Sequence, residues 1–279
     1  MMTFVEFLRF AGEYPGYPRF LERTAVDRKG YQKWVDCGRP AGLVTELYDH
    51  PDYLEGLYKG RAVKDDGSCD LSKIAFAPSI AGEYPRDGRG RPVHPYAEEI
   101  LAAGLALEGP GAYWQYGPNL CADPIVLGVG RDGKLRTFAI ERSDTGHVAL
   151  PGGHLDPGES PMMAAMREFT EETSVELYVN SLIRAENVMD YLVPDPRTTL
   201  NAWPETSVWV FVVGDNLIDK MQPRASSDAA NAWCKVLDDE FYHFMNAGHA
   251  IFVREAVRWF EEEFEVIVCD DGYVDANQD

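Results

Sequence analysis

The sequence predicts an α/β protein in which a mixed sheet is covered by helices on both sides. From residue 114 onward, short apolar and β-prone runs alternate with two segments of helical periodicity, an order typical of a sheet with helices on its faces. A hydrophobic content of 45% with 12% aromatic residues supports a sizeable core. Residues 1–110 are instead rich in Pro, Gly and Tyr with only short periodicity, so we expect an irregular N-terminal region there.

Strands are predicted wherever apolar and β-branched residues gather between turn signals. A turn at Asp132-Gly133 is expected to join the first two strands as a hairpin. A shorter extended run at 147–150 leads into a glycine-rich loop. The predicted strands are 124–129, 136–141, 188–193, 207–213 and 233–236.

From residue 114 onward two helices are predicted, at 161–173 and 251–264. In the N-terminal region, short helices are expected at 4–10 and 53–58, and a helix at 96–107. Ser160 suits the N-cap of the first helix and Pro161 suits its first helical position. On a helical wheel of about 100° per residue, an apolar arc of this helix lies beside an arc that holds three glutamates. The second helix also has one apolar face. Each helix can therefore bury one side against a sheet.

The three glutamates of the first helix are Glu168, Glu171 and Glu172. Like charges three and four residues apart repel each other and raise each other's pKa. A divalent cation removes this penalty, and hard oxygen ligands suit Mg²⁺. A solvated acidic face is the alternative interpretation. The preceding loop favours a ligand site, because Gly152 and Gly153 let the backbone approach a ligand closely.

The spacing of these residues resembles the Nudix box. The pattern is a glycine, five residues, Glu159, seven residues, Arg167-Glu168 and an apolar residue, then one residue and two further glutamates. It departs from the family at its last glycine, which is Ser174 here, and this puts the conformation after the helix in question. The resemblance implies a Nudix-type α/β/α sandwich with a mixed sheet.

Three further segments, at 114–125, 139–159 and 195–206, resemble the ADP-ribose pyrophosphatase branch of the Nudix family. The ADP-ribose-sensing domain of melastatin-type TRP channels shares the third segment. The resemblance covers about 114–260. We therefore assign a Nudix domain to 111–265 and a flexible acidic tail to 266–279. Residues 1–110 stay unassigned, with a cap over the substrate cleft as one option.

The resemblance also implies a metal site, with Mg²⁺ as the cofactor and Mn²⁺ as a substitute. Glu168 and Glu172 are the expected direct ligands, and the Gly152 carbonyl is the expected third ligand. Glu171 is expected to hold outer-shell water or a further ion. Arg167 is expected to orient the carboxylates, with Glu159 as its partner. A carboxylate of the box can serve as general base, but the sequence does not select one.

Substrate-binding residues follow from the same resemblance. Asp195 can accept hydrogen bonds from sugar hydroxyls, and Arg197 can direct two donors to a phosphate or a ribose hydroxyl. A surface ion pair in a loop is the alternative for this pair. His249 falls where the family places a histidine on the ligand side; an ordinary histidine at a helix N-terminus is equally compatible. Asn201 and Trp203 are expected to organise the loop.

The implied function is Mg²⁺-dependent hydrolysis of ADP-ribose to AMP and ribose 5-phosphate. One alternative is a sensor module that binds ADP-ribose without hydrolysing it. Another is a Nudix pyrophosphatase that acts on a different nucleoside diphosphate derivative. The arginine-glutamate-apolar part of the box and both later glutamates are intact, which favours an enzyme.

Composition limits the partners of the chain. A formal net charge of −20 disfavours binding to nucleic acid or to anionic membranes. No long apolar run suggests a membrane-spanning segment, and the start of the chain lacks the pattern of a signal peptide. Five scattered cysteines indicate reduced thiols and a cytoplasmic location. The sequence leaves the oligomeric state open.

Overall fold

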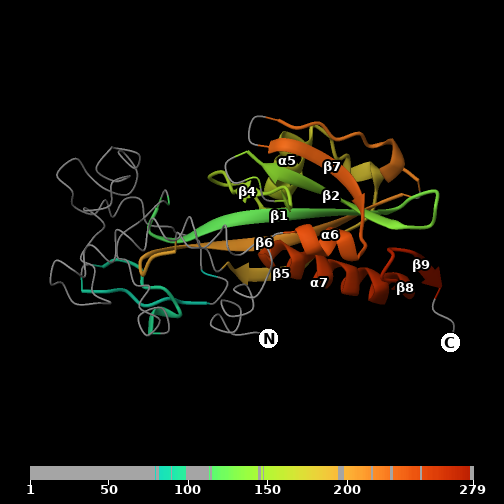
Figure 1. The fold of residues 1–279 in the computed structure, drawn as a ribbon. Coiled ribbons are helices and arrows are strands. Elements are labelled where there is room, and N and C mark those ends of the chain that lie inside the picture. The colour runs from blue at the N-terminus through green and yellow to red at the C-terminus, as the bar shows by residue number, and fades with distance from the viewer. Residues whose placement is uncertain are drawn as a thin grey trace. The chain divides into compact units, whose positions relative to one another are not determined.

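The fold is taken from a computed structural model of the chain (Figure 1). It describes residues 79, 82–88, 90–98, 113, 115–143, 146, 148–193, 198–214, 216–226, 229–245 and 247–276. The short helices expected in the first 78 residues lie outside this part. The chain divides into two compact units. Described residues up to Leu120 belong to the first unit with Leu192–Glu205, and the second contains Cys121–Tyr191 and Thr206–Asp279.

A seven-stranded sheet forms the centre of the fold, with the order β3-β2-β1-β6-β5. β7 pairs with β2, and β4 pairs with β1. The strands are β1 (Gly117–Val129), β2 (Leu135–Arg142), β3 (Val148–Ala149), β4 (Gly153–His154), β5 (Leu182–Leu192), β6 (Ala202–Val213) and β7 (Ala229–Val236). All the predicted strands are present, and the hairpin of β1 and β2 is confirmed.

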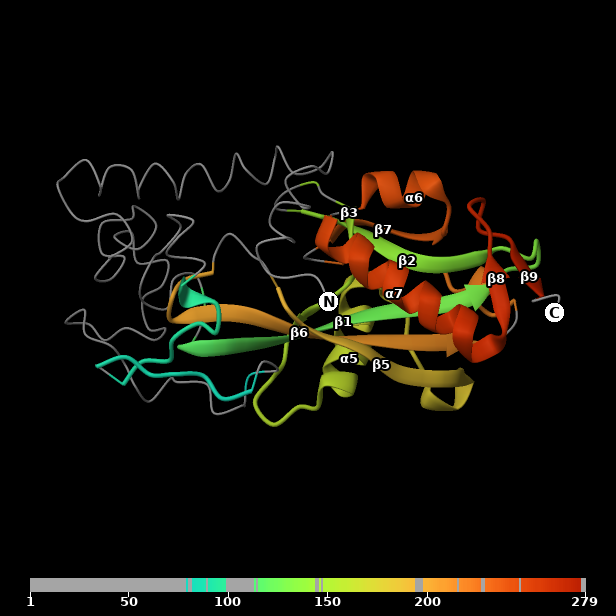
Figure 2. The ribbon, with the colours of Figure 1, turned by 90° about the horizontal axis from the view of Figure 1, so that it is seen from below.

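Helices cover this sheet on both faces within the second unit. α5 (Pro161–Thr173) lies on one face, and α6 (Asp239–Phe244) and α7 (Ala247–Phe264) lie on the other (Figures 1 and 2). Two short 3₁₀ turns lie at Val179–Ser181 and Ile218–Lys220. In the first unit, residues 97–98 are helical, inside the helix expected at 96–107, and the rest of that stretch lies outside the described residues. The predicted α/β class is confirmed.

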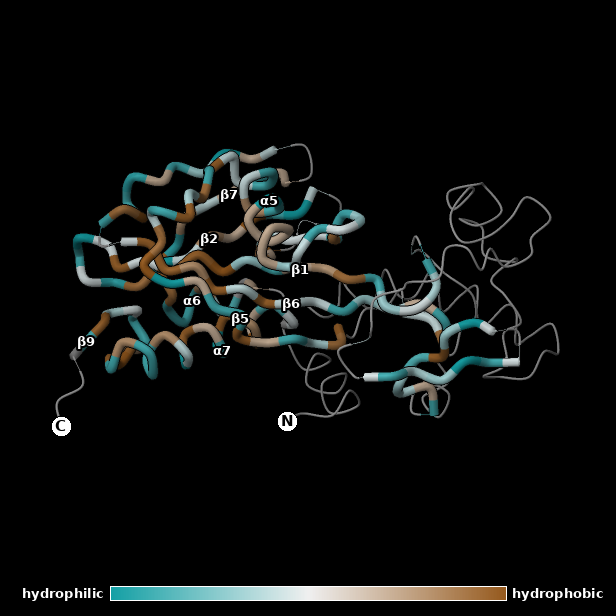
Figure 3. The backbone as a smooth tube through the Cα atoms, turned by 180° about the vertical axis from the view of Figure 1, so that it is seen from behind, coloured by the Kyte–Doolittle hydropathy of each residue, from teal (hydrophilic) through white to brown (hydrophobic). Residues whose placement is uncertain are grey.

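Alternation along the strands produces two separate hydrophobic cores. Neighbouring strand residues point to opposite faces of a sheet, and Ile125 and Leu127 therefore belong to the core under α7, together with Phe252. Val126 belongs to the core under α5, where Phe169 of the helix also lies. Figure 3 shows apolar stretches along the strands of this unit and along one side of its helices. The two cores hold α5 and α7 on opposite sides of the sheet.

α5 forms as its sequence predicts. The Ser160 side chain caps it by accepting a hydrogen bond from the Met163 N–H at 3.3 Å, and a proline occupies the first turn. Phe169 is fully buried and packs edge-on against Phe138 of β2, with ring centroids 5.0 Å apart. The apolar side of α5 therefore faces the sheet.

Ser174, which replaces the last glycine of the motif, ends α5 in the left-handed conformation, with φ of 57° and ψ of 22°. Its N–H donates a hydrogen bond to the Thr170 carbonyl. The helix is thus terminated in the usual way by a residue other than glycine, and the strain stays local.

Buried polar side chains join described segments of the first unit. Glu205 accepts hydrogen bonds from the Trp203 indole N–H at 2.7 Å and from the Ser79 hydroxyl at 2.5 Å. The Asn201 amide donates to the Pro92 carbonyl at 2.8 Å. Asn201 thus joins the residue before β6 to Pro92, and Trp203 is a buried residue of β6 itself. Their expected role in organising the loop stays a prediction.

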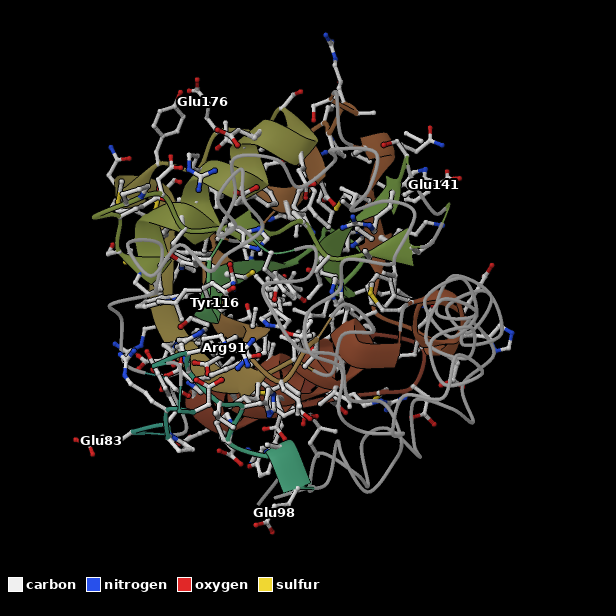
Figure 4. All side chains as sticks on the ribbon, turned by 90° about the vertical axis from the view of Figure 1, so that its left-hand side faces the viewer. Glu83, Arg91, Glu98, Tyr116, Glu141 and Glu176 are labelled. Atoms are coloured by element: carbon white, nitrogen blue, oxygen red, sulfur yellow. The ribbon has the colours of Figure 1, made fainter. Side chains whose placement is uncertain are left out.

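Two charged side chains of the first unit, Glu83 and Arg91, have different surroundings (Figure 4). The Glu83 side chain points outward. Arg91 is buried, and its guanidinium forms an ion pair with Asp87 at 2.6 Å. A paired guanidinium of this kind supports the fold and leaves little charge to attract an anionic ligand.

The chain end differs from the flexible tail that the sequence suggested. β8 (Val266–Val268) and β9 (Val274–Ala276) form a two-stranded antiparallel sheet, with Val266 opposite Ala276. The Leu135 N–H donates to the Gly272 carbonyl at 2.8 Å, so the hairpin is fastened to the start of β2. An Asp-Gly pair in the turn, flanked by valines, is the local signal for it.

None of the described helices is long and apolar enough to cross a membrane.

Candidate active site

The glycine loop enters the sheet where β1 and β2 part. β1 pairs with β2 at Gly128 and Val129, near the end of the strand. At the earlier residues Cys121 and Ala122 it pairs with β4 instead. Ile140 of β2 lies opposite Ala149 of β3 on one side and Ala232 of β7 on the other. The loop between β3 and β4 therefore fills the opening between the two strands. This placement brings Gly152 against the inner surface of β1.

Two carboxylates of α5 lie against the glycine pair of this loop. The Gly152 N–H donates a hydrogen bond to Glu172 Oε2 at 2.9 Å, and Glu172 is buried. A side chain at Gly153 would place its Cβ 2.5 Å from the carboxylate of Glu168. Glycine is therefore required at 153 so that Glu168 can approach. The structure brings together three of the four predicted metal-site residues.

Arg167 connects the acidic side chains of the motif. Its guanidinium forms two hydrogen bonds with Glu159, at 3.0 and 2.8 Å. Nη1 also donates to Glu168 at 2.7 Å and to Glu171 at 3.1 Å, and Nη2 donates to the His154 carbonyl at 2.9 Å. The contacts between Arg167 and the carboxylates agree with the expected orienting role, although the part each residue plays in catalysis stays a prediction.

The charges in this cluster shift the pKa values in opposite directions. The hydrogen bonds from Arg167 hold the pKa of Glu159 below its usual range and raise the pKa of the guanidinium. Burial raises the pKa of Glu168, an effect that Arg167 opposes and that Glu171 reinforces by repulsion. A cation beside Glu168 would favour its charged form.

The fourth predicted metal-site residue, Glu171, is more open than the others. Its side chain is 57% exposed, against 14% for Glu168. Arg167 Nη1 at 3.1 Å is the partner of its carboxylate. An exposed carboxylate beside the buried Glu172 and the partly buried Glu168 fits the expected role of holding outer-shell water or a further ion.

The donor set suits a hard divalent cation. It consists of glutamate oxygens, which Mg²⁺ and Mn²⁺ prefer. Within the part of the chain that the structure describes, no three His, Cys, Asp or Glu side chains already converge on one point. The reason is visible in the contacts: Arg167 engages Glu168 and Glu171, and a backbone N–H engages Glu172. Binding an ion therefore requires small rearrangements of these carboxylates.

His249 is a further residue that contacts the glycine loop. It lies near the start of α7, its Nδ1 accepts a hydrogen bond from the Leu150 N–H at 2.7 Å, and its ring stacks on Phe252. Burial lowers the pKa of its imidazole. One ring nitrogen thus serves the loop, and contact of His249 with a substrate stays a prediction. The predicted substrate residues Asp195 and Arg197 lie outside the described residues.

Sequence reasoning missed Asp123, which lies in the middle of β1. Its Oδ2 accepts a hydrogen bond from the Thr206 hydroxyl at 2.6 Å, and the residue is only 8% exposed. A Cβ at Gly152 would lie 2.3 Å from the other carboxylate oxygen. The available signal was that Asp123 is the only charged residue in the thirteen of β1. A lone carboxylate in an otherwise apolar strand often has a specific partner.

Comparison with known families decides the membership of the chain. The NUDIX domain family model matches residues 124–260. The chain belongs to the Nudix family. The mitochondrial ADP-ribose pyrophosphatase of Rattus norvegicus is 31% identical over 263 residues, which cover 84% of this chain and 67% of the rat protein. The family resemblance seen in the sequence is therefore confirmed.

Two further relatives share the Nudix region. A Caenorhabditis elegans protein assigned to the nudix hydrolases is 33% identical over 174 residues, 58% of this chain and 62% of the nematode protein. The transient receptor potential cation channel subfamily M member-like 2 of Nematostella vectensis is 29% identical over 165 residues, 50% of this chain. The match spans 10% of that channel. The chain thus spans less than two thirds of the nematode relative and a small part of the channel.

Proposed function

We propose that the protein is a Mg²⁺-dependent ADP-ribose pyrophosphatase that converts ADP-ribose and water to AMP and ribose 5-phosphate. The main support is the placement of Glu168 and Glu172 against the glycine pair of a Nudix box that keeps its arginine and all its glutamates. The likeness to the rat ADP-ribose pyrophosphatase, which extends over 84% of this chain, supports the choice of substrate.

The reaction follows from what these side chains can do. Water adds to one phosphorus as the bridging P–O bond breaks, so one phosphate ends on AMP and the other on ribose 5-phosphate. A bound Mg²⁺ supplies charge neutralisation for the diphosphate and lowers the pKa of a coordinated water. Glu168 and Glu172 would hold that ion, with the Gly152 carbonyl as the third ligand.

Arg167 keeps the carboxylates in position for this chemistry. Its two bonds to Glu159 hold the guanidinium at the start of the helix, and its bond to Glu168 aims that carboxylate. Paired charge-assisted hydrogen bonds fix geometry better than a single contact does. The general base stays unassigned, and a carboxylate of the box can fill this role.

The net charge of the protein makes the metal ion important for binding as well as for chemistry. With a formal charge of −20, the chain repels a dianionic diphosphate at long range. The one guanidinium of the motif is already engaged by three glutamates. The ion is therefore expected to supply much of the attraction between the protein and ADP-ribose, and a chelator should weaken substrate binding as well as turnover.

The test is product analysis with the full chain. We expect equal amounts of AMP and ribose 5-phosphate from ADP-ribose with Mg²⁺, and no product after addition of EDTA. Glu172→Gln should lower the rate about 100-fold or more, because it removes a proposed metal ligand. Glu176→Gln is the matched control: Glu176 is an exposed glutamate just beyond the helix (Figure 4), and this variant should keep the wild-type rate.

Two results would replace the proposal with one of its alternatives. Binding of ADP-ribose without any product would identify a sensor module, an alternative that the likeness to a melastatin-type channel keeps open. Faster hydrolysis of another nucleoside diphosphate derivative in a substrate panel would identify a different Nudix pyrophosphatase. The cytoplasmic location stays a prediction from the sequence. The oligomeric state stays open.

A further inference from the structure

The backbone just before the Nudix helix is gripped by side chains from three elements. His249 of α7 accepts a hydrogen bond from the Leu150 N–H at 2.7 Å. Glu172 of α5 accepts one from the Gly152 N–H at 2.9 Å. Asp123 of β1 approaches Gly152 so closely that a Cβ there would lie 2.3 Å from its Oδ1. Two loop residues, Leu150 and Gly152, are thus contacted by side chains from three elements.

Asp123 is held in this place by an interaction of its own. The Thr206 hydroxyl donates to Oδ2 at 2.6 Å, and Thr206 is only 1% exposed. The two carboxylate oxygens therefore have different surroundings: one binds β6, and the other lies against the loop. A buried carboxylate costs free energy unless hydrogen bonds or charges compensate it, so its presence in an apolar strand calls for a purpose.

Gly152 lies between two carboxylates, one on each side of its peptide. The Glu172 side chain binds its N–H, while Asp123 and the Ala122 carbonyl oxygen pack against its Cα, the latter 3.0 Å from an ideal Cβ. The Gly152 N–H belongs to the planar peptide that it shares with Pro151, and the Gly152 carbonyl belongs to the next peptide. The hydrogen bond to Glu172 therefore orients the first peptide, while the atoms of β1 that crowd the Cα restrict rotation between the two peptides. Together these contacts limit the directions that the Gly152 carbonyl can take.

The electrostatic surroundings of Asp123 agree with this arrangement. Burial raises the pKa of its carboxyl group, while His249, the Thr206 hydroxyl and Arg142 act in the opposite direction. The direct partner among these groups is the Thr206 hydroxyl of β6, and the guanidinium that favours the charged form, Arg142, comes from β2. Asp123 is thus tied to the elements that surround the loop.

We propose that Asp123, held by Thr206, is a positioning residue of the metal centre: it fixes the peptide of Gly152 so that the metal ligands of the Nudix box stay aligned. This inference rests on the proposed metal site but does not depend on which nucleotide is cleaved. Mutation of outer-shell groups of this kind typically lowers metal affinity or activity by about 10–100-fold. A carboxylate that served only the core would affect folding and leave metal affinity unchanged.

The test measures Mn²⁺ affinity of the full chain without substrate, from the electron paramagnetic resonance signal of free Mn²⁺. Asp123→Ala should weaken binding about 10–100-fold. Thr206→Val, which removes only the hydroxyl, should weaken it by a smaller factor. Thr206→Ser restores the hydroxyl and should return the affinity to the wild-type value. Thermal melting of each variant shows whether it is folded.

Glu205→Gln is the matched control. Glu205 is also a fully buried carboxylate of β6 that accepts hydrogen bonds from side chains, and it directly precedes Thr206. It accepts hydrogen bonds from Trp203 and Ser79, which lie outside the glycine loop. This variant should therefore keep the wild-type affinity for Mn²⁺. An equal loss of affinity in Glu205→Gln would mean that any buried carboxylate has this effect, and the inference would be wrong.

Wild-type affinity in a folded Asp123→Ala protein would also overturn the inference. If that variant does not fold, wild-type affinity in Thr206→Val overturns it instead. The proposed function fails separately: Asp123-dependent Mn²⁺ binding in a protein that does not cleave ADP-ribose keeps this inference and rejects the substrate. If the protein cleaves ADP-ribose but its Mn²⁺ affinity does not depend on Asp123, the proposed function stands and this inference is rejected.

Discussion

Two parts of the Nudix loop use glycine for different physical reasons. At Gly152 and Gly153 the space for a side chain is already occupied by the carboxylates of Asp123 and Glu168. At Gly158 no atom lies within 4 Å of an added Cβ, but φ is +83°. The first pair provides close approach to the acidic groups, and the later glycine provides only a turn. The atoms around a motif glycine, and its φ angle, therefore decide why glycine is needed at that position.

The largest effect is expected at Gly152. Gly152→Ala places a methyl group 2.3 Å from Asp123 Oδ1 and 3.0 Å from a backbone oxygen of Ala122. Neither group can move away easily, since the first is hydrogen-bonded and buried and the second is part of β1. We expect a stability loss of about 1–3 kcal/mol, typical of an overpacked site, with Mn²⁺ binding abolished. Urea unfolding and Mn²⁺ titration measure the two effects.

Gly153→Ala should reduce activity more than stability. The three atoms nearest to the added Cβ all belong to the carboxylate of Glu168, the first of them 2.5 Å away, at the end of a flexible side chain. Glu168 can swing aside, but it then leaves its place beside the loop and its bond to Arg167. We expect loss of hydrolysis with a thermal midpoint close to that of the wild type. A melting temperature lowered as much as in Gly152→Ala would contradict this distinction.

Gly158→Ala is the contrasting change. Its surroundings are open, so only the positive φ opposes the substitution. A left-handed conformation costs an L-residue roughly 1–2 kcal/mol, and alanine recovers part of this by lowering the entropy of the unfolded chain. We expect a stability loss of about 1 kcal/mol or less, with Mn²⁺ affinity and turnover near wild type. A loss of activity equal to that of Gly153→Ala would show that the turn itself positions the metal ligands.

The smallest effect is expected at Ser174, where the family motif has glycine. Ser174→Gly relieves a φ of 57° without removing any side-chain bond of the helix cap, which uses the backbone N–H. We expect stabilisation of about 0.5–1 kcal/mol, measured by urea unfolding, and unchanged turnover. Ser174→Ala keeps the strain and is the control; a gain in both variants would mean that the serine side chain, and not φ, causes the instability.

The elements that the sequence predicted well carry their own local signals. α5 has an N-cap, a proline in its first turn and a regular apolar arc, and these are properties of neighbouring residues. β1 and β6 extend several residues before the predicted starts, to Gly117 and Ala202. Prolines near both starts obscured them, because proline usually marks the end of a strand or its edge.

The parts that the sequence did not predict depend on distant residues. Asp123 gains its position from Thr206, which is 83 residues away, and from the loop that enters between β1 and β2. α6 has only six residues, too few for a periodic pattern, although Asp238 caps it by accepting from the Phe241 N–H at 2.9 Å. The acidic cluster of the box was readable because its spacing is local. Its glycine contacts were not, because they join a loop to a helix and a strand.

The most direct test of the account is a crystal structure of the full chain with Mn²⁺. We predict an anomalous-scattering peak bound by the carboxylates of Glu168 and Glu172 and by the carbonyl of Gly152, at about the 2.0–2.2 Å expected for a small hard cation. A structure in which bound Mn²⁺ lies elsewhere, or in which these three groups bind no ion at saturating Mn²⁺, would contradict the account.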